Sequence, residues 1–327
     1  MILKNQFALL LFFAIALGSA PMLAQFAPRF RQHDTNQSRG LRLVPADSRP
    51  PGASQVSIEV VGSKRIIQSN GIPDHQTGAF PNHGNPNGIS QQQYAYRVAA
   101  NPKPADRITP LGMQNFGIGV NGIPFDPGAA EWFHGDPRGG WQYEALSGAV
   151  PLGIDTNHAH VQPTGAYHYH GLPSGLLKSL KVVRGQHSPI VGWAADGFPI
   201  YALYGYQDAN NPESEIVELK SSYRLKRGDR PRGNGNPGGQ YDGSFLADYE
   251  FVEGAGDLDE CNGRFGVTPD YPEGTYAYYL SDQWPVIPRN FRGEPSSDFD
   301  RGGPGQQGPP GGQRRPGFGP PPPRPRR

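Results

Sequence analysis

The stretch Asp155-Thr-Asn-His-Ala-His-Val-Gln-Pro-Thr-Gly-Ala-Tyr-His-Tyr-His-Gly171 holds four of the nine histidines in the 327-residue sequence. They form two pairs, and one residue separates the members of each pair: His158 and His160, then His168 and His170. Alternate residues of a β-strand face the same side of a sheet, so each pair is expected to share a face. The Gln-Pro-Thr-Gly segment between the pairs is typical of a turn. The sequence therefore predicts a β-hairpin.

The spacing also predicts the register of this hairpin. If the turn is centred on Thr164, His160 lies opposite His168 and His158 lies opposite His170. Directly opposed Cβ atoms in an antiparallel pair are about 4.5 to 5.5 Å apart, so we expect the four imidazoles to share one patch. The other face is suited to packing on a core. It carries Ala159, Val161, Tyr167 and Tyr169.

Four imidazoles on one face have no packing purpose, and protonating them together at about pH 6 would place like charges side by side. A bound cation explains them more simply than a solvated or structural histidine face. Imidazole ligands suit copper, zinc, nickel and iron better than calcium or magnesium. We therefore predict a divalent transition metal, copper or zinc, bound by at least three of these histidines. The predicted ligands are His158, His160, His168 and His170.

Three acidic residues and one cysteine are candidates for support of the metal ligands. Asp196-Gly197 and Asp259-Glu-Cys-Asn-Gly263 are most simply turns, the second with a buried cysteine. In the functional interpretation, such groups act as a further ligand, as a hydrogen-bond partner of the ligands, or as a base. The candidates are Asp155, Asp196, Glu260 and Cys261.

The N-terminus has the features of a secretory signal peptide over residues 1–24. Lys4 precedes the apolar run Phe7–Leu17, which is too short to span a bilayer, and small residues follow it. No later stretch approaches the roughly 18 consecutive apolar residues of a membrane helix. We expect a protein secreted to the periplasm, the cell envelope or the medium. Its single cysteine, Cys261, cannot form an intramolecular disulfide.

Composition predicts the fold class. The chain has 45 glycines, 36 prolines, 15 tyrosines and 16 phenylalanines, which favours short strands joined by turns over helices. We expect a mostly β, single β-sandwich-like or barrel-like domain. Three Asn-Gly or Asp-Gly pairs mark strand ends, at Asn70, Asn121 and Asp196. Short helical turns are expected at Ser174–Leu180 and Ala129–Phe133.

Composition also predicts the boundaries of this domain. Residues 25–54 contain few apolar side chains and read as a disordered linker, and the β domain spans residues 55–291. Residues 292–327 are rich in Gly, Pro and Arg, so we expect a disordered tail whose positive charge can contact an acidic surface polymer. The 30 basic and 29 acidic residues of the whole chain balance, which gives no reason to expect nucleic acid as a partner.

Four separated motifs resemble the YHYH-motif family of secreted bacterial proteins, over about Ser69–Arg289. They are Asn121-Gly-Ile-Pro124, Tyr167-His-Tyr-His170, Asp196-Gly-Phe-Pro-Ile-Tyr201 and Leu258-Asp-Glu-Cys-Asn-Gly263. The resemblance implies an extracytoplasmic domain, for which metal binding is a common suggestion and not an established activity. Members of the family often carry histidines in a second strand, where this chain has Ala277 and Tyr279.

Three classes of function remain open. The first is a metal-binding protein that sequesters or delivers a transition ion. The second is a metalloenzyme, a hydrolase or an oxidoreductase, in which three histidines leave an open metal position and Asp155 or Asp196 acts as base. The third is a structural or adhesive envelope protein. The sequence contains no nucleotide-binding loop, Ser-His-Asp pattern or nucleophile elbow, and it assigns no catalytic residue.

Overall fold

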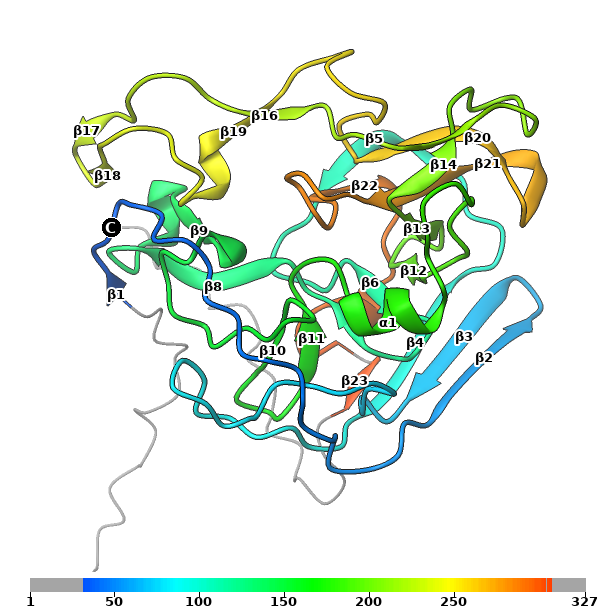
Figure 1. The fold of residues 1–327 in the computed structure, drawn as a ribbon, viewed down its shortest axis with the longest axis horizontal. Helices are drawn as coiled ribbons and strands as arrows, with labels where there is room; N and C mark the ends of the chain where they lie inside the picture. Colours follow the sequence, from blue (N-terminus) through cyan, green and yellow to red (C-terminus); the bar gives the residue numbers. More distant parts are fainter. Residues whose placement is uncertain (1–31, 304, 308–327) are drawn as a thin grey trace, which may run out of the picture.

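The computed structural model describes residues 32–303 and 305–307, and the fold is mostly β, as the composition predicts (Figure 1). The described helices are short: α1 (Ser174–Ser179), which was predicted, and the 3-10 turns η1 (Pro137–Gly139), η2 (Ala145–Ser147), η3 (Leu246–Asp248) and η4 (Ser297–Phe299). None of these helices is long and apolar enough to cross a membrane.

An eight-stranded mixed sheet forms the centre of the fold, in the strand order β10-β11-β7-β6-β12-β13-β21-β20. β11 runs parallel to β7 and β13 parallel to β21, whereas the other neighbours are antiparallel. β10 and β20 are its two edges, so the sheet is open and does not form a closed barrel. Its strands are β6 (Gly117–Gly119), β7 (Pro124–Phe125), β10 (Ala159–Val161), β11 (Tyr167–Tyr169), β12 (Gly192–Ala194), β13 (Pro199–Ala202), β20 (Gly263–Thr268) and β21 (Tyr271–Leu280).

Smaller sheets surround the central one. A four-stranded sheet has the order β2-β3-β4-β23, and its β2–β3 hairpin projects at the lower right of Figure 1. These strands are β2 (Val56–Val61), β3 (Lys64–Ser69), β4 (Gln93–Ala99) and β23 (Gln306–Gln307). A three-stranded sheet consists of β1 (Gln32–His33), β8 (Gly128–Phe133) and β9 (Gln142–Glu144). The two-stranded pairs are β5 (Pro104–Pro110) with β22 (Asn290–Gly293), β14 (Tyr204–Tyr206) with β15 (Ile216–Glu218), β16 (Tyr223–Leu225) with β19 (Tyr249–Phe251), and β17 (Arg232–Gly233) with β18 (Asn236–Pro237).

The main hydrophobic core packs on the central sheet and is rich in aromatic side chains. Phe125 of β7 and Tyr169 of β11 are fully buried there, with ring centroids 5.7 Å apart. A second cluster lies around Phe245 and the strands β8 and β9. The predicted helical turn at Ala129–Phe133 is wrong, because this segment is part of β8 and buries alternate residues, the period of a strand.

The Asn-Gly and Asp-Gly pairs follow the ends of β3, β6 and β12, as predicted. Gly71, Gly122 and Gly197 all have positive φ, at +64°, +77° and +94°. At Gly122 the close approach of Ser69 adds a second constraint, since a Cβ there would collide with the serine side chain. Only glycine meets both requirements without strain.

Two segments in which low apolar content predicts disorder are packed against the domain. Near the N-terminus, Leu41 and Leu43 contact the second core cluster. Near the other end, Phe299 is fully buried and stacks on Tyr96 with centroids 4.1 Å apart. A few buried apolar side chains, together with backbone hydrogen bonds to the domain, therefore hold residues 33–54 and 292–303 in place. The predicted signal peptide, residues 25–31 and residues 308–327 lie outside the described residues.

Candidate metal centre

The predicted hairpin is present, and its register is the predicted one. In the antiparallel pair of β10 and β11, His160 lies opposite His168 and Val161 opposite Tyr167. The turn closes where the Gly165 N–H donates to the Gln162 carbonyl at 2.8 Å. The four residues of the opposite face, Ala159, Val161, Tyr167 and Tyr169, are buried in the core.

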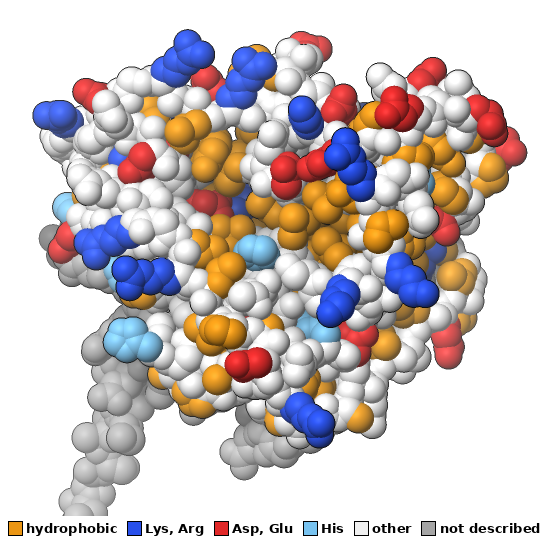
Figure 2. Space-filling view, in the orientation of Figure 1, with side chains coloured by type: hydrophobic (Ala, Val, Ile, Leu, Met, Phe, Trp, Pro, Cys, Tyr) orange, Lys and Arg blue, Asp and Glu red, His pale blue; other side chains and the backbone are white. Residues whose placement is uncertain are grey.

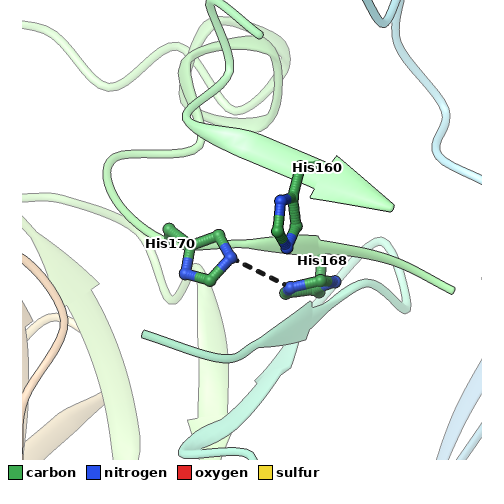
Figure 3. Close-up of side chains that lie close together, drawn as sticks. All are labelled: His160, His168 and His170. Atoms are coloured by element: carbon green, nitrogen blue, oxygen red, sulfur yellow. Dashed lines mark hydrogen bonds between the residues drawn. The ribbon is translucent and has the colours of Figure 1, made fainter. Parts of the chain in front are cut away.

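Three of the four histidines meet on the side of this hairpin opposite those core side chains, and two of them are buried there. Figure 3 shows the rings of His160, His168 and His170 directed toward one another, and their potential ligand atoms lie within 4.8 Å of one another. Nε2 of His168 is 3.0 Å from Nε2 of His170. Two nitrogens bound to one tetrahedral zinc ion at about 2.0–2.1 Å are separated by about 3.3 Å. The spacing of this pair is therefore close to the one that a bound metal ion requires.

His158 does not join the cluster, which corrects the predicted four-histidine patch. Its backbone carbonyl accepts a hydrogen bond from the His170 N–H at 2.7 Å, so the backbones of His158 and His170 are paired as predicted. However, His158 has a left-handed φ of +53° and lies outside β10, so the alternation of side chains has ended before it. Its Nδ1 lies 2.8 Å from the Leu172 carbonyl.

Burial keeps two of the three imidazoles neutral. His168 and His170 are 2% and 1% exposed, whereas His160 is half-buried. Loss of water lowers the pKa of His168 to about 4. It also lowers the pKa of His170 well below its usual value, and positive charge on His160, His168 and Arg289 adds to this effect. Both rings are therefore ready as ligands at pH 7, because metals bind the neutral imidazole.

Backbone carbonyls orient the rings. Nδ1 of His160 is 3.0 Å from the Leu152 carbonyl, and Nδ1 of His168 is 3.1 Å from the Ala166 carbonyl. Because a carbonyl only accepts, Nδ1 of each neutral ring carries the proton and Nε2 keeps its lone pair. This is how metal-binding histidines are commonly held. Nδ1 of His170 is buried without a well-formed hydrogen bond, although the Pro127 carbonyl favours its charged form.

Asp126 is a buried carboxylate beside the cluster that the sequence did not reveal. Phe125 of β7 pairs in parallel with Tyr169, and the next N–H, that of Asp126, donates to the Tyr169 carbonyl at 2.9 Å. The carboxylate of Asp126 accepts a hydrogen bond from the side chain of Gln162, which follows β10, at 2.9 Å, and lies close enough to His160 for their charges to interact. Burial raises the pKa of Asp126, and Arg301 and His160 oppose this increase. No sequence motif marks this residue, because a parallel neighbour brings it to the site.

The supporting residues predicted from the sequence are placed elsewhere. Asp155 is fully buried and accepts hydrogen bonds from the N–H groups of Gly78 and Asn157, both at 2.8 Å, and from the Tyr167 hydroxyl at 2.7 Å. Asp196 accepts from the Tyr278 hydroxyl at 2.5 Å and from the Gly293 N–H at 2.9 Å. These carboxylates hold turns together. The structure does not bring them to the three histidines.

The remaining two candidates lie around the turn before β20. Glu260 is exposed, and its backbone carbonyl accepts hydrogen bonds from Tyr223 and Asn290. Cys261 is fully buried, and burial raises the pKa of its thiol. Within the described part of the chain, the cluster of potential metal ligands contains only the three histidines.

A family model described as YHYH protein matches residues 95–293, which include the whole hairpin and Asp126. This chain belongs to the YHYH protein family. No curated protein and no solved structure matches it.

The YHYH motif has two faces with different chemistry. Its histidines, His168 and His170, belong to the cluster, and its tyrosines point into a buried polar network. The Tyr169 hydroxyl is 2.6 Å from Nε2 of His75 and accepts from the Asn121 amide at 3.0 Å. The Tyr167 hydroxyl donates to Asp155. Both tyrosine hydroxyls are therefore hydrogen-bonded in the core, where they anchor β11.

A cavity of about 440 Å³ lies beside His158 in this YHYH protein. It is lined by His158, Glu144, Leu172 and the stacked pair of Tyr249 and Trp284, whose centroids are 4.1 Å apart. Figure 2 shows the hollow near the centre of this face, where hydrophobic and acidic side chains lie together. The three clustered histidines do not line this cavity.

Proposed function

We propose that this protein binds one transition metal ion, copper or zinc, through His160, His168 and His170. The observation that carries the proposal is the convergence of three imidazoles with ligand atoms within 4.8 Å. Burial of two rings and the carbonyls that face Nδ1 of His160 and His168 support it, because they favour neutral, oriented ligands. Imidazole donors suit copper and zinc.

Three protein ligands would leave a fourth position open. Structural zinc sites commonly have four protein ligands, whereas catalytic sites have three and an exchangeable water. The count of three rather than four therefore favours a centre that exchanges a ligand or releases its metal. We rank a carrier of the ion before a metalloenzyme because the three histidines do not line the cavity at His158, where a substrate could bind. The N-terminal sequence supports a location in the periplasm, the cell envelope or the medium.

Metal titration of the full-length protein tests the proposal. Calorimetry with zinc and anaerobic or aerobic titration with copper should give one ion per chain, confirmed by elemental analysis. Replacing His160 with alanine should weaken binding at least about tenfold, since loss of even a supporting partner costs 10–100-fold. His158→Ala is the matched control, because this histidine lies on the same hairpin outside the cluster. Equal losses in both variants, or no binding by wild type, would exclude the three-histidine centre.

A further inference from the structure

Asp126 has one carboxylate oxygen with partners and one without. The Gln162 amide donates to Oδ2 at 2.9 Å, and Nη2 of Arg301 lies 3.3 Å from the same oxygen. Oδ1 is buried and makes no hydrogen bond of good geometry, although the Gly128 N–H favours the charged form. The side chain of Asp126 is 1% exposed. A buried acceptor without a donor is costly, so its retention needs an explanation.

The position of Asp126 relates this free oxygen to the histidines. β11, which carries His168 and His170, lies between β10, which carries His160, and β7, which leads into Asp126. Gln162 follows β10 on the side of His160, and its amide reaches Asp126 across β11. The carboxylate is electrostatically coupled to His160. Its oxygens are not among the clustered ligand atoms, so Asp126 adjoins the centre without being a ligand in this arrangement.

We propose that Asp126 is a positioning residue whose Oδ1 accepts a hydrogen bond from a protic molecule, such as water, in the fourth position of the metal. The proposal rests on the three-histidine centre. Gln162 and Arg301 hold Oδ2, so Oδ1 is the oxygen that can accept a further hydrogen bond. A fixed negative charge at this place favours a ligand that donates a proton and disfavours a simple anion. The exchangeable ligand of this centre is therefore of the water or alcohol class.

Azide is a suitable probe, because it is an anion without a proton to donate. The full-length protein is loaded with copper(II), and azide is titrated while the charge-transfer band and the electron paramagnetic resonance spectrum are recorded. Asp126→Asn should keep one copper per chain and bind azide about tenfold more tightly, as expected when one nearby unit charge is removed in a partly screened site. Asp298→Asn, at a buried carboxylate paired with Arg97, is the matched control and should behave like wild type.

A second variant, Arg301→Ala, makes the electrostatic potential at the metal more negative, whereas Asp126→Asn makes it more positive. Arg301 is 40% exposed, so Arg301→Ala should fold, and it leaves the charge of Asp126 uncompensated. Azide should then bind more weakly than in wild type. Equal azide affinity in wild type, Asp126→Asn and Arg301→Ala would overturn the proposal, as would loss of copper from Asp126→Asn, which would make Asp126 a ligand. If Asp126→Asn does not fold, Asp126→Ser decides, because it also removes the negative charge and should likewise tighten azide binding. Failure of wild type to bind copper would instead overturn the metal centre itself.

Discussion

Acid should destabilise the metal-free protein through the buried histidines. The pKa of His168 is lowered from 6.5 to about 4 in the folded protein, because burial penalises the charged ring. Each unit of difference in pKa between the folded and unfolded states corresponds to about 1.36 kcal/mol. The lowered pKa of His168 can therefore reduce the free energy of unfolding by about 3 kcal/mol, once the histidine is protonated in the unfolded chain and still neutral in the folded protein. The unfolded state takes up this proton first as the pH falls. The free energy of unfolding should therefore decrease between about pH 6.5 and pH 4, with no further loss from His168 below that range.

Urea unfolding of chelator-treated protein at several pH values between 7.5 and 4 measures this effect. His168→Asn removes the titrating group, so its loss of unfolding free energy over this range should be about 3 kcal/mol smaller than that of wild type. His158→Asn controls for the removal of a histidine that lies outside the cluster. If His168→Asn and wild type lose stability equally, His168 is not held neutral by burial, and the argument for a pre-formed neutral ligand fails.

Three further predictions concern the ligands, the motif tyrosines and the C-terminal segment. Zinc affinity, followed by calorimetry, should fall less steeply between pH 6.5 and pH 5.5 than expected for three ordinary imidazoles, because His168 takes up a proton only at about pH 4; a fall as steep as that of three protons per ion would contradict this. Tyr169→Phe leaves His75 and Asn121 without their shared partner, so urea unfolding should show a loss of about 1–3 kcal/mol. Tyr204→Phe is the control, because Tyr204 is half-buried and this change should leave the packing of the core unchanged. Phe299→Ala should cost about 3–5 kcal/mol, because this ring is fully buried in the core. An unchanged melting temperature in Phe299→Ala would mean that residues 292–303 do not stabilise the domain.

Local patterns in the sequence determined the fold class and the hairpin. The Gln-Pro-Thr-Gly turn and the equal spacing about Thr164 predicted the pairing of His160 with His168, because turn chemistry and strand alternation act over a few residues. The same alternation separated the tyrosines of the motif from its histidines. The abundance of glycine, proline and aromatic residues predicted short strands, and the separated motifs predicted the family.

Only the tertiary structure decided which groups form the centre. His158 leaves the predicted patch because the turn that begins at Asp155 gives it a left-handed backbone, and hydrogen bonds from Gly78 and Tyr167 hold that aspartate. Asp126 follows β7, which lies more than thirty residues before the hairpin in the sequence and pairs in parallel with β11. A parallel pairing of this kind leaves no local signal in the sequence. The packing of Phe299 likewise depends on a distant strand. Strand faces follow from short-range geometry, whereas the chemistry of this site depends on long-range contacts that spacing does not encode.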